Sequence, residues 1–203
     1  KNKGTGAKYR MSIGKLVVLS APSGTGKTSI CKKLLEKNSK WKFSISATTR
    51  KLREDELDGK DYIQMSNEKF EHFVKFGDFL EWEWVHGNKY GTPIGPLEDV
   101  LDSGGIMILD IDVKGGLTVM NEFPDETIGI FIEPPGDDLP EQLEVLEERL
   151  TERGNEPAKL IKQRLKRFPI EIEYKKDFDF DFVNDDLNET VEEIEKVIKE
   201  NIK

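Results

Sequence analysis

The sequence predicts an α/β fold built on a mainly parallel sheet, and three features indicate it. Short apolar runs with the length of buried strands recur along the chain. Several of them are followed by amphipathic stretches with helical periodicity, which is the alternation typical of parallel sheets. The chain has 203 residues, enough for one domain with a proper hydrophobic core and small additions.

The elements can be placed in order. The apolar runs predict strands at residues 16–19, 106–109, 128–132 and 180–183. Helical patterns lie at residues 28–35, at 117–120 and from 187 to 202. Between residues 44 and 93 the pattern changes to mixed alternation, aromatic residues and turn residues, with one helix-like piece at 68–76. We therefore expect this block to be an antiparallel subdomain inserted into the core.

The charge of the chain limits its partners. Its 40 Asp and Glu residues outnumber 31 Lys and Arg residues, and the formal net charge is −9. Because phosphate neutralisation dominates polynucleotide binding, this charge argues against a general nucleic-acid binder, although a small anionic ligand needs only a local cluster of cations. No apolar run is long enough to span a membrane.

The N-terminus and the cysteine content indicate where the protein works. Residues 1–10 carry basic side chains, no acidic ones and no apolar periodicity, so we interpret them as the remnant of an expression tag or a disordered extension. Cys31 is the single cysteine, and no signal-like apolar segment precedes the first strand. These features favour a reducing, cytoplasmic location.

The most informative segment follows the first predicted strand and precedes the first predicted helix. It has the pattern of a phosphate-binding loop (P-loop), formed by Ala21, Pro22, Ser23, Gly24, Thr25, Gly26, Lys27 and Thr28. The glycines let backbone N–H groups turn toward phosphate oxygens, and the helix start adds the positive end of its dipole. Lys27 can reach the β- and γ-phosphates of a nucleoside triphosphate, and the Thr28 hydroxyl can coordinate Mg²⁺. Ala21, where the pattern usually has Gly, is a departure that ordinary backbone angles would tolerate.

A second group of polar residues lies in the block at 44–93. Arg50 and Arg53 sit beside hydroxyl groups in an arrangement suited to a second phosphate, to which Tyr62 and Tyr90 could donate further hydrogen bonds. Glu81 lies in an apolar segment, and a carboxylate accepts the paired N–H donors on the guanine edge, which adenine lacks. Taken singly, each residue also fits a surface arginine, a core tyrosine or a salt-bridged acid. Together, beside a phosphate-binding loop, they favour a site for guanine monophosphate.

From residue 14 to residue 202 the sequence resembles the guanylate kinases. The resemblance rests on the motifs SAPSGTGKT, SISATTRKLR, DGKDY, FLEW, HGNKYGTP, LDIDVKGG, IFIEPP and FDFVND. It implies a three-layer fold of the P-loop NTPase type, with a parallel core sheet, an inserted antiparallel GMP-binding subdomain and a helical lid. It also implies a single kinase domain at residues 11–203, with a core at 11–43, 94–134 and 156–203, the GMP-binding subdomain at 44–93 and the lid at 135–155.

The resemblance implies roles for individual residues. The residues assigned to GMP are Ser46, Arg50, Arg53, Tyr62, Glu81, Tyr90, Thr92 and Asp112. Arg50, Arg53 and the two tyrosines would hold the phosphate, and the others would face the guanine base. Asp110 would lie near Mg²⁺ together with Thr28, either directly or through water. Asn184 would lie close to the adenine of ATP.

The implied reaction is in-line phosphoryl transfer from ATP to GMP, and to dGMP, with Mg²⁺ as cofactor. The acceptor phosphate oxygen is already ionised, so no general base is needed and positive charge supplies the catalysis. The catalytic residues are expected to be Lys27, Arg50, Arg149, Arg153 and Arg164, with Arg167 as an additional candidate. The predicted lid is about six residues longer than is usual in the family and strongly acidic. Pairing with acids one helical turn away is therefore the alternative for the lid arginines.

Two other functions stay open at this stage. A guanylate-kinase-like interaction domain would keep the fold as a scaffold, but such domains lose parts of the P-loop, which is complete here from Gly26 to Thr28. A kinase for another phosphorylated acceptor, such as a ribose phosphate, would leave Glu81 and Ser46 with no base to bind. We therefore expect ATP and GMP or dGMP as partners, without nucleic acid or membrane. The oligomeric state stays open, a homodimer included.

Overall fold

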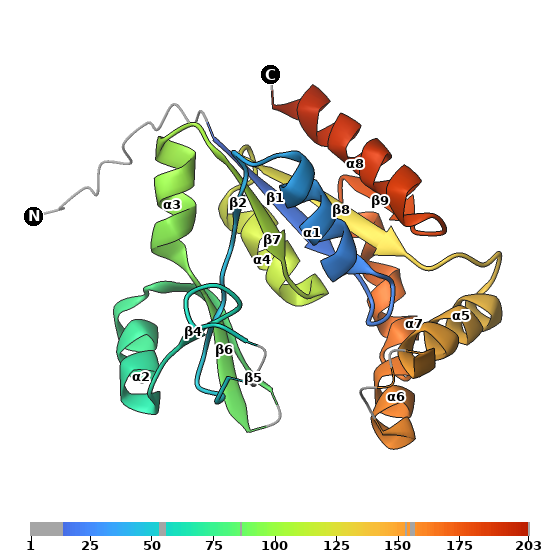
Figure 1. Ribbon diagram of the computed structural model, residues 1–203. Helices are drawn as coiled ribbons and strands as arrows, with labels where there is room; N and C mark the ends of the chain where they lie inside the picture. Colours follow the sequence, from blue (N-terminus) through green and yellow to red (C-terminus); the bar gives the residue numbers. More distant parts are fainter. Residues whose placement is uncertain (1–13, 53–55, 86, 153, 155–156, 203) are drawn as a thin grey trace, which may run out of the picture.

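The computed structural model describes residues 14–52, 56–85, 87–152, 154 and 157–202 (Figure 1). The extension predicted at residues 1–10 lies outside these described residues, as do Arg53 and Arg153. Within the described part of the chain, the predicted α/β architecture with a parallel core sheet is confirmed.

The core is a five-stranded sheet in the order β2-β7-β1-β8-β9, in which every neighbouring pair is parallel. Its strands are β1 (Lys15–Ser20), β2 (Lys42–Phe43), β7 (Ile106–Asp110), β8 (Thr127–Glu133) and β9 (Phe180–Val183). The four predicted strands are all present, whereas the short β2 escaped prediction because it has no apolar run. Parallel pairing brings the C-terminal ends of β1 and β7 to one edge of the sheet, where ligands bind in folds of this kind.

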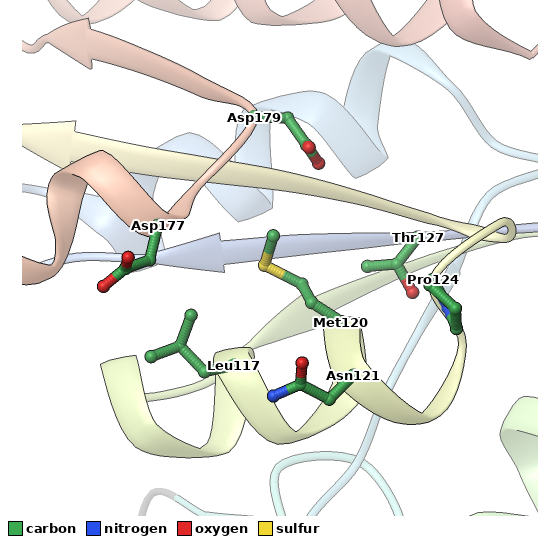
Figure 2. A pocket seen from close by; sticks show the side chains of 7 residues that line it. All are labelled: Leu117, Met120, Asn121, Pro124, Thr127, Asp177 and Asp179. Atoms are coloured by element: carbon green, nitrogen blue, oxygen red, sulfur yellow. The ribbon is translucent and has the colours of Figure 1, made fainter.

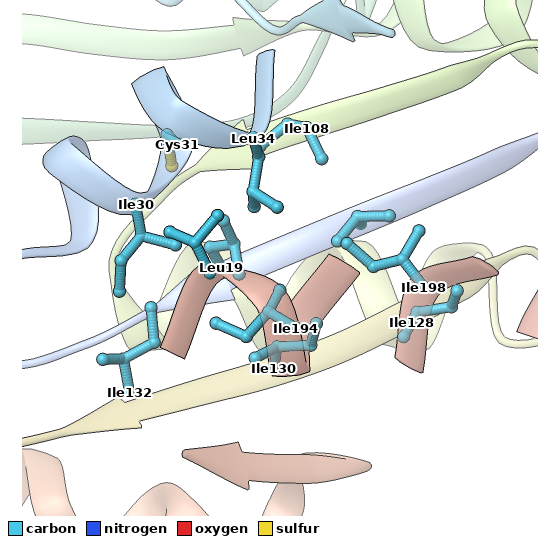
Figure 3. Packing of buried hydrophobic residues seen from close by; sticks show 12 residues of the cluster. Leu19, Ile30, Cys31, Leu34, Ile108, Ile128, Ile130, Ile132, Ile194 and Ile198 are labelled. Carbon is cyan, nitrogen blue, oxygen red and sulfur yellow. The ribbon is translucent and has the colours of Figure 1, made fainter. Parts of the chain in front are cut away.

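Helices cover both faces of the sheet. They are α1 (Lys27–Lys37) and α8 (Leu187–Asn201) on one face, and α3 (Ile94–Asp102) and α4 (Val113–Glu122) on the other. Figure 3 shows the first face, where Leu19 of β1 packs among Ile30 of α1 and Ile194 of α8. Leu16 and Val18 of the same strand point to the other face, toward α3 and α4. Burial on both sides explains why the β1 sequence is an unbroken apolar run.

Residues 44–93 form a separate four-stranded sheet in the order β4-β3-β6-β5, accompanied by one helix. Its elements are β3 (Ala47–Thr48), β4 (Ile63–Gln64), α2 (Asn67–Phe76), β5 (Phe79–Val85) and β6 (Asn88–Pro93). The pairs β3–β6 and β5–β6 are antiparallel, as predicted. The β3–β4 pair is parallel instead, because the chain runs back after β3 and places Ile63 beside Ala47. The subdomain is therefore a mixed sheet, with a small core in which α2 contributes Phe70.

A group of helices follows β8, and its first member lies against the P-loop. The group consists of α5 (Leu139–Glu152), α6 (Ala158–Leu165), α7 (Phe168–Glu171) and the 3₁₀ helix η1 (Ile172–Asp177). Of these, α5 falls within the range predicted for the lid. Leu146 and Leu150 are buried, and a Cβ added at Gly24 would come within 3.2 Å and 3.1 Å of their side chains. Figure 1 shows these helices and the second sheet on opposite sides below the core sheet.

No helix in the described ranges combines the length and the apolar character that crossing a lipid bilayer requires.

Glu195 of α8 fastens the last helix to α1. Its carboxylate forms an ion pair with Lys37 at 2.9 Å and accepts a hydrogen bond from Asn38 at 2.8 Å, and Lys199 pairs with it from the next turn of α8. The hydrogen bonds from Lys199 and Lys37 lower the pKa of Glu195 to about 2. The fold thus favours the ionised carboxylate.

Replacing Glu195 with Gln should therefore lower the melting temperature at pH 7 by about 1–4 °C, the range for a solvent-exposed ion-pair network in a domain of this size. Because the folded-state pKa is lowered, this stabilisation is fully present above about pH 4.3, the ordinary pKa of Glu, and is lost as the pH falls toward 2. Thermal melts of both proteins across this range measure the effect. Glu193→Gln, on the exposed side of α8, is the matched control, and equal losses in both variants would contradict the assignment.

Candidate active site

The P-loop joins β1 to α1 through six residues that curl around the start of the helix. Gly24 and Gly26 have backbone φ angles of 97° and 93°, in the left-handed region that favours glycine. The Thr25 hydroxyl donates to the Pro22 carbonyl at 2.9 Å, and the Asn184 amide donates to the Thr25 carbonyl at 2.6 Å. These bonds fix the loop so that backbone N–H groups at the start of α1 can bind an anion.

Lys27, Thr28 and Asp110 meet at the C-terminal ends of β1 and β7. The Lys27 ammonium lies 2.7 Å from Asp110 Oδ1 and donates to the Ile111 carbonyl at 2.6 Å. The Thr28 hydroxyl donates to Asp110 Oδ2 at 2.9 Å. The structure thus brings together the three residues that the sequence assigned to the phosphates and the metal ion. One carboxylate and one hydroxyl are hard oxygen ligands, which suit Mg²⁺ when substrate phosphates and water complete its shell.

A cavity of about 280 Å³ opens over the P-loop, and arginines line its other side. Arg164 donates to the Ser23 hydroxyl at 2.8 Å, so the C-terminal end of α6 contacts the P-loop directly. Arg167 also lines this cavity and forms an ion pair with Glu171 at 3.1 Å. Burial raises the pKa of Glu171. Glu171 was missed from the sequence, where the spacing of one helical turn from Arg167 was its only signal.

A neighbouring cavity of about 400 Å³ lies on the other side of the loop, between α5 and the segment after β9. Arg149 lines it and donates to the Asn184 carbonyl at 2.9 Å. The Arg149 guanidinium is therefore placed at this cavity, and the P-loop cavity is lined by Arg164 and Arg167 instead. Asn184 is 5% exposed, and its Oδ1 is buried without a hydrogen-bond partner among the described residues.

The predicted acceptor residues meet on the second sheet. The Arg50 guanidinium donates from Nε to the Tyr90 hydroxyl at 3.1 Å and lies 5.3 Å from the centre of the Tyr62 ring. The two tyrosine rings pack edge to face, with centroids 6.0 Å apart. Burial raises the pKa of Tyr62, which keeps its hydroxyl protonated as a donor. A cation and two phenolic hydroxyls thus converge here, as an anionic group requires.

Glu81 and Thr92 lie opposite each other on β5 and β6, on the same face of this sheet. The Thr92 hydroxyl donates to Glu81 Oε1 at 2.6 Å. Burial raises the pKa of Glu81, and the hydrogen bond from Thr92 opposes only part of this effect. Asp112 begins α4 as its N-cap, accepting a hydrogen bond from the Gly115 N–H at 2.8 Å, and it also lines the P-loop cavity.

The two halves of the site face each other across one cavity of about 530 Å³. Thr28 and Asp110 line it from the P-loop side, and Ser46 and Tyr62 line it from the second sheet. The structure therefore places the expected metal ligands and part of the expected acceptor site on opposite walls of a common space. Arg53 and Arg153, predicted for the acceptor and the lid, lie outside the described residues.

A further cavity, of about 470 Å³, lies elsewhere on the molecule (Figure 2). Leu117, Met120 and Asn121 of α4 form one wall, and Asp177 at the end of η1 and Asp179 just before β9 face them. Its lining contains two carboxylates and no Lys or Arg among the described residues, and Thr127 places it at the N-terminal end of β8. Its charge and its position at the opposite end of the strands make it unsuited to a phosphate.

Fold and site together define a P-loop nucleotide-binding protein with an inserted subdomain, on which Arg50 lies against Tyr62 and Tyr90. The family model for guanylate kinases matches residues 13–201, and the chain belongs to the guanylate kinase family. It is 43% identical to a guanylate kinase of Clostridium tetani over 93% of this chain and 86% of the relative. It is 40% identical to one of Chlorobium luteolum over 90% and 89%. The crystal structure of guanylate kinase from Anaplasma phagocytophilum superposes with a TM-score of 0.74 at 34% identity, covering 95% of this chain and 88% of that one.

Proposed function

We propose that this protein transfers the γ-phosphoryl group of ATP to the phosphate of GMP, producing ADP and GDP. The observation that carries the proposal is the pair Glu81–Thr92 beside the Arg50–Tyr90 contact, both on a sheet that faces a complete P-loop. The pair offers acceptors to the guanine edge, and the arginine offers charge to the phosphate. Membership of the guanylate kinase family supports the same reaction.

On this proposal the P-loop holds the donor phosphates and Lys27 follows the transferred group. The Lys27 ammonium exchanges its contacts with Asp110 and the Ile111 carbonyl for phosphate oxygens. Arg164, already hydrogen-bonded to the P-loop Ser23, adds charge from the lid side. The acceptor oxygen of GMP is ionised, so these residues only align the two phosphates and stabilise the charge that spreads over the transferred group.

Mg²⁺ belongs to this proposal because the residues present fit it. Thr28 and Asp110 would hold the ion, directly or through water, next to the donor phosphates. When bound, it would neutralise charge on the β- and γ-phosphate oxygens. The described residues contain no cluster of three or more His, Cys, Asp or Glu side chains around one point, which agrees with an ion held largely by substrate phosphates.

The proposal extends to the choice of nucleotides. Asn184, whose amide donates to the Thr25 carbonyl, lines the 400 Å³ cavity beside the P-loop, where the adenine of ATP would lie. On the acceptor side the assigned groups meet only the base and the phosphate, so dGMP should react as well as GMP. A reducing cytoplasm completes the proposal, since Cys31 is a free, buried thiol.

Turnover with different acceptors tests the proposal. In a coupled assay of ADP formation, GMP and dGMP should react at least about 100-fold better than AMP or UMP, because those bases leave the Glu81 carboxylate unpaired. Ribose 5-phosphate should give no signal, and EDTA should abolish turnover. Equal rates with AMP and GMP would contradict the role of Glu81. No turnover with any acceptor would favour a binding domain over a kinase.

A further inference from the structure

The Arg50 guanidinium is almost fully engaged within the protein. Its Nε donates to the Tyr90 hydroxyl, and its Nη1 donates to the Lys51 carbonyl at 2.7 Å. Its Nη2 donates to both carboxylate oxygens of Glu56, each at 2.8 Å. Tyr90 lies at Nε, the Lys51 carbonyl at Nη1 and both Glu56 oxygens at Nη2, so every nitrogen of the guanidinium has a partner among the described residues. A phosphate that binds Arg50 through two parallel hydrogen bonds therefore competes with Glu56 for Nη2.

Three of the four contacts that hold Arg50 are suited to stay when a phosphate binds. The Tyr62 ring stacks against the guanidinium, Tyr90 is fixed on β6, and the Lys51 carbonyl belongs to the neighbouring backbone. These three orient the guanidinium plane without Glu56. The Glu56 carboxylate is the one partner that carries negative charge, and a phosphate repels it.

Glu56 also has a place to move to. Its side chain is 13% exposed in the ion pair with Arg50, but it lines the 530 Å³ cavity between α1 and the second sheet. Lys32 and Lys60 line the same cavity. A carboxylate released from Arg50 can therefore rotate into open space beside two cations, which lowers the free-energy cost of displacing it.

We propose that Glu56 is an internal anion that occupies the phosphate-binding side of Arg50 and is displaced by the phosphate of GMP. This inference rests on the assignment of Arg50 to the acceptor phosphate in the proposed function. Glu56 then sets the affinity of this site for anions: it lowers the affinity for every ligand whose anionic group must take Arg50, and a doubly charged phosphate competes with it better than a singly charged group. Guanosine, which has no phosphate, does not meet this competition.

Binding of GMP and of guanosine to Glu56→Gln tests the inference. Glutamine keeps the size and one acceptor oxygen but removes the charge, so GMP should bind about three- to tenfold more tightly by calorimetry, the range for a partly exposed ion pair. The Kd for guanosine should stay within about twofold. Glu83→Gln is the matched control: Glu83 lies opposite Tyr90 on β5 and carries the same charge, and its side chain makes no hydrogen bond or ion pair to another described residue. It should change neither Kd.

The outcomes separate this inference from the proposed function. GMP binding that is unchanged or weaker in Glu56→Gln would overturn the inference and make Glu56 a group that merely orients Arg50. An equal gain in GMP affinity in Glu83→Gln would overturn the inference too, because loss of any nearby negative charge would then explain the tighter binding. Arg50→Ala tests the assignment beneath it: GMP should bind more weakly and guanosine unchanged. If Arg50→Ala left GMP binding intact, the phosphate site itself would be wrongly placed. Should Glu56→Gln not fold, Glu56→Ala serves in its place.

Discussion

Replacing Lys27 with Met should lower kcat for the reaction of ATP with GMP by about 10²- to 10³-fold, the usual loss for a group that stabilises transition-state charge. Lys27 stands at the start of α1, where its ammonium lies 2.7 Å from Asp110 and 2.6 Å from the Ile111 carbonyl. Phosphate oxygens of ATP can take over these contacts. Methionine has a similar length and no charge, so the transferred group would lose this cation. Steady-state kinetics at saturating concentrations of both nucleotides measure the loss.

A matched control lies on the same helix. Lys33→Met makes the same chemical change, but the Lys33 ammonium contacts Asn188 on the surface at 2.9 Å, and kcat should stay within about twofold of the unaltered protein. GMP binding should be normal in both variants, because the acceptor residues lie on the second sheet. A kcat for Lys27→Met within tenfold of the unaltered protein would contradict the role given to Lys27.

The P-loop could be predicted because its information is local. Gly24, Gly26, Lys27 and Thr28 lie close together at the junction of a strand and a helix, and the positive φ angles of the two glycines follow from that position. The parallel core sheet was predictable for a similar reason, since a strand buried on both faces needs a continuous apolar run. Asp110 could be placed near the metal ion because it ends the strand at residues 106–110, where P-loop proteins carry an acid.

The parts that escaped prediction depend on contacts between distant segments. Arg164 donates a hydrogen bond to Ser23, which lies 141 residues away in the sequence. Neither local sequence indicates this contact. Arg149 donates a hydrogen bond to the Asn184 carbonyl, 35 residues further along the chain, and no local pattern indicates this contact. Glu56 lies six residues after Arg50, a spacing that suits no regular element, so only the folded loop could reveal their ion pair. Pairing of this kind is decided by tertiary packing, which local patterns do not encode.

Replacing Glu81 with Gln should raise the Kd for GMP by about 10- to 100-fold and leave the Kd for ATP near its original value. The carboxylate is half-buried, and Oε1 accepts the Thr92 hydroxyl at 2.6 Å. Guanine presents two neighbouring N–H donors, which two carboxylate oxygens can accept in parallel. Glutamine turns one of these oxygens into an NH₂ donor, which would face a donor of the base. Calorimetric titration with each nucleotide measures both constants.

The pKa of Glu81 gives this prediction a dependence on pH. Burial raises the pKa, so the carboxylate takes up a proton at a higher pH than an ordinary Glu, whose pKa is about 4.3. Protonation removes an acceptor, so GMP affinity should fall as the pH drops toward this range. The GMP phosphate also titrates, near pH 6, and contributes its own slope. In Glu81→Gln, the affinity for GMP still depends on ionisation of the phosphate but no longer on ionisation of residue 81. The difference between the pH profiles of the two proteins therefore isolates the contribution of Glu81.

Two comparisons show whether the effect comes from reading the base. IMP lacks the exocyclic amine of guanine, so Glu81→Gln should weaken IMP binding less than GMP binding and reduce the preference for GMP. Glu83→Gln, two residues along the same strand, should leave both constants unchanged, since the Glu83 side chain makes no hydrogen bond or ion pair to another described residue. Equal losses for GMP and IMP, or a loss of ATP binding as large as that of GMP, would mean that the substitution disturbs the subdomain. The Glu81–Thr92 pair would then hold β5 to β6 without selecting guanine.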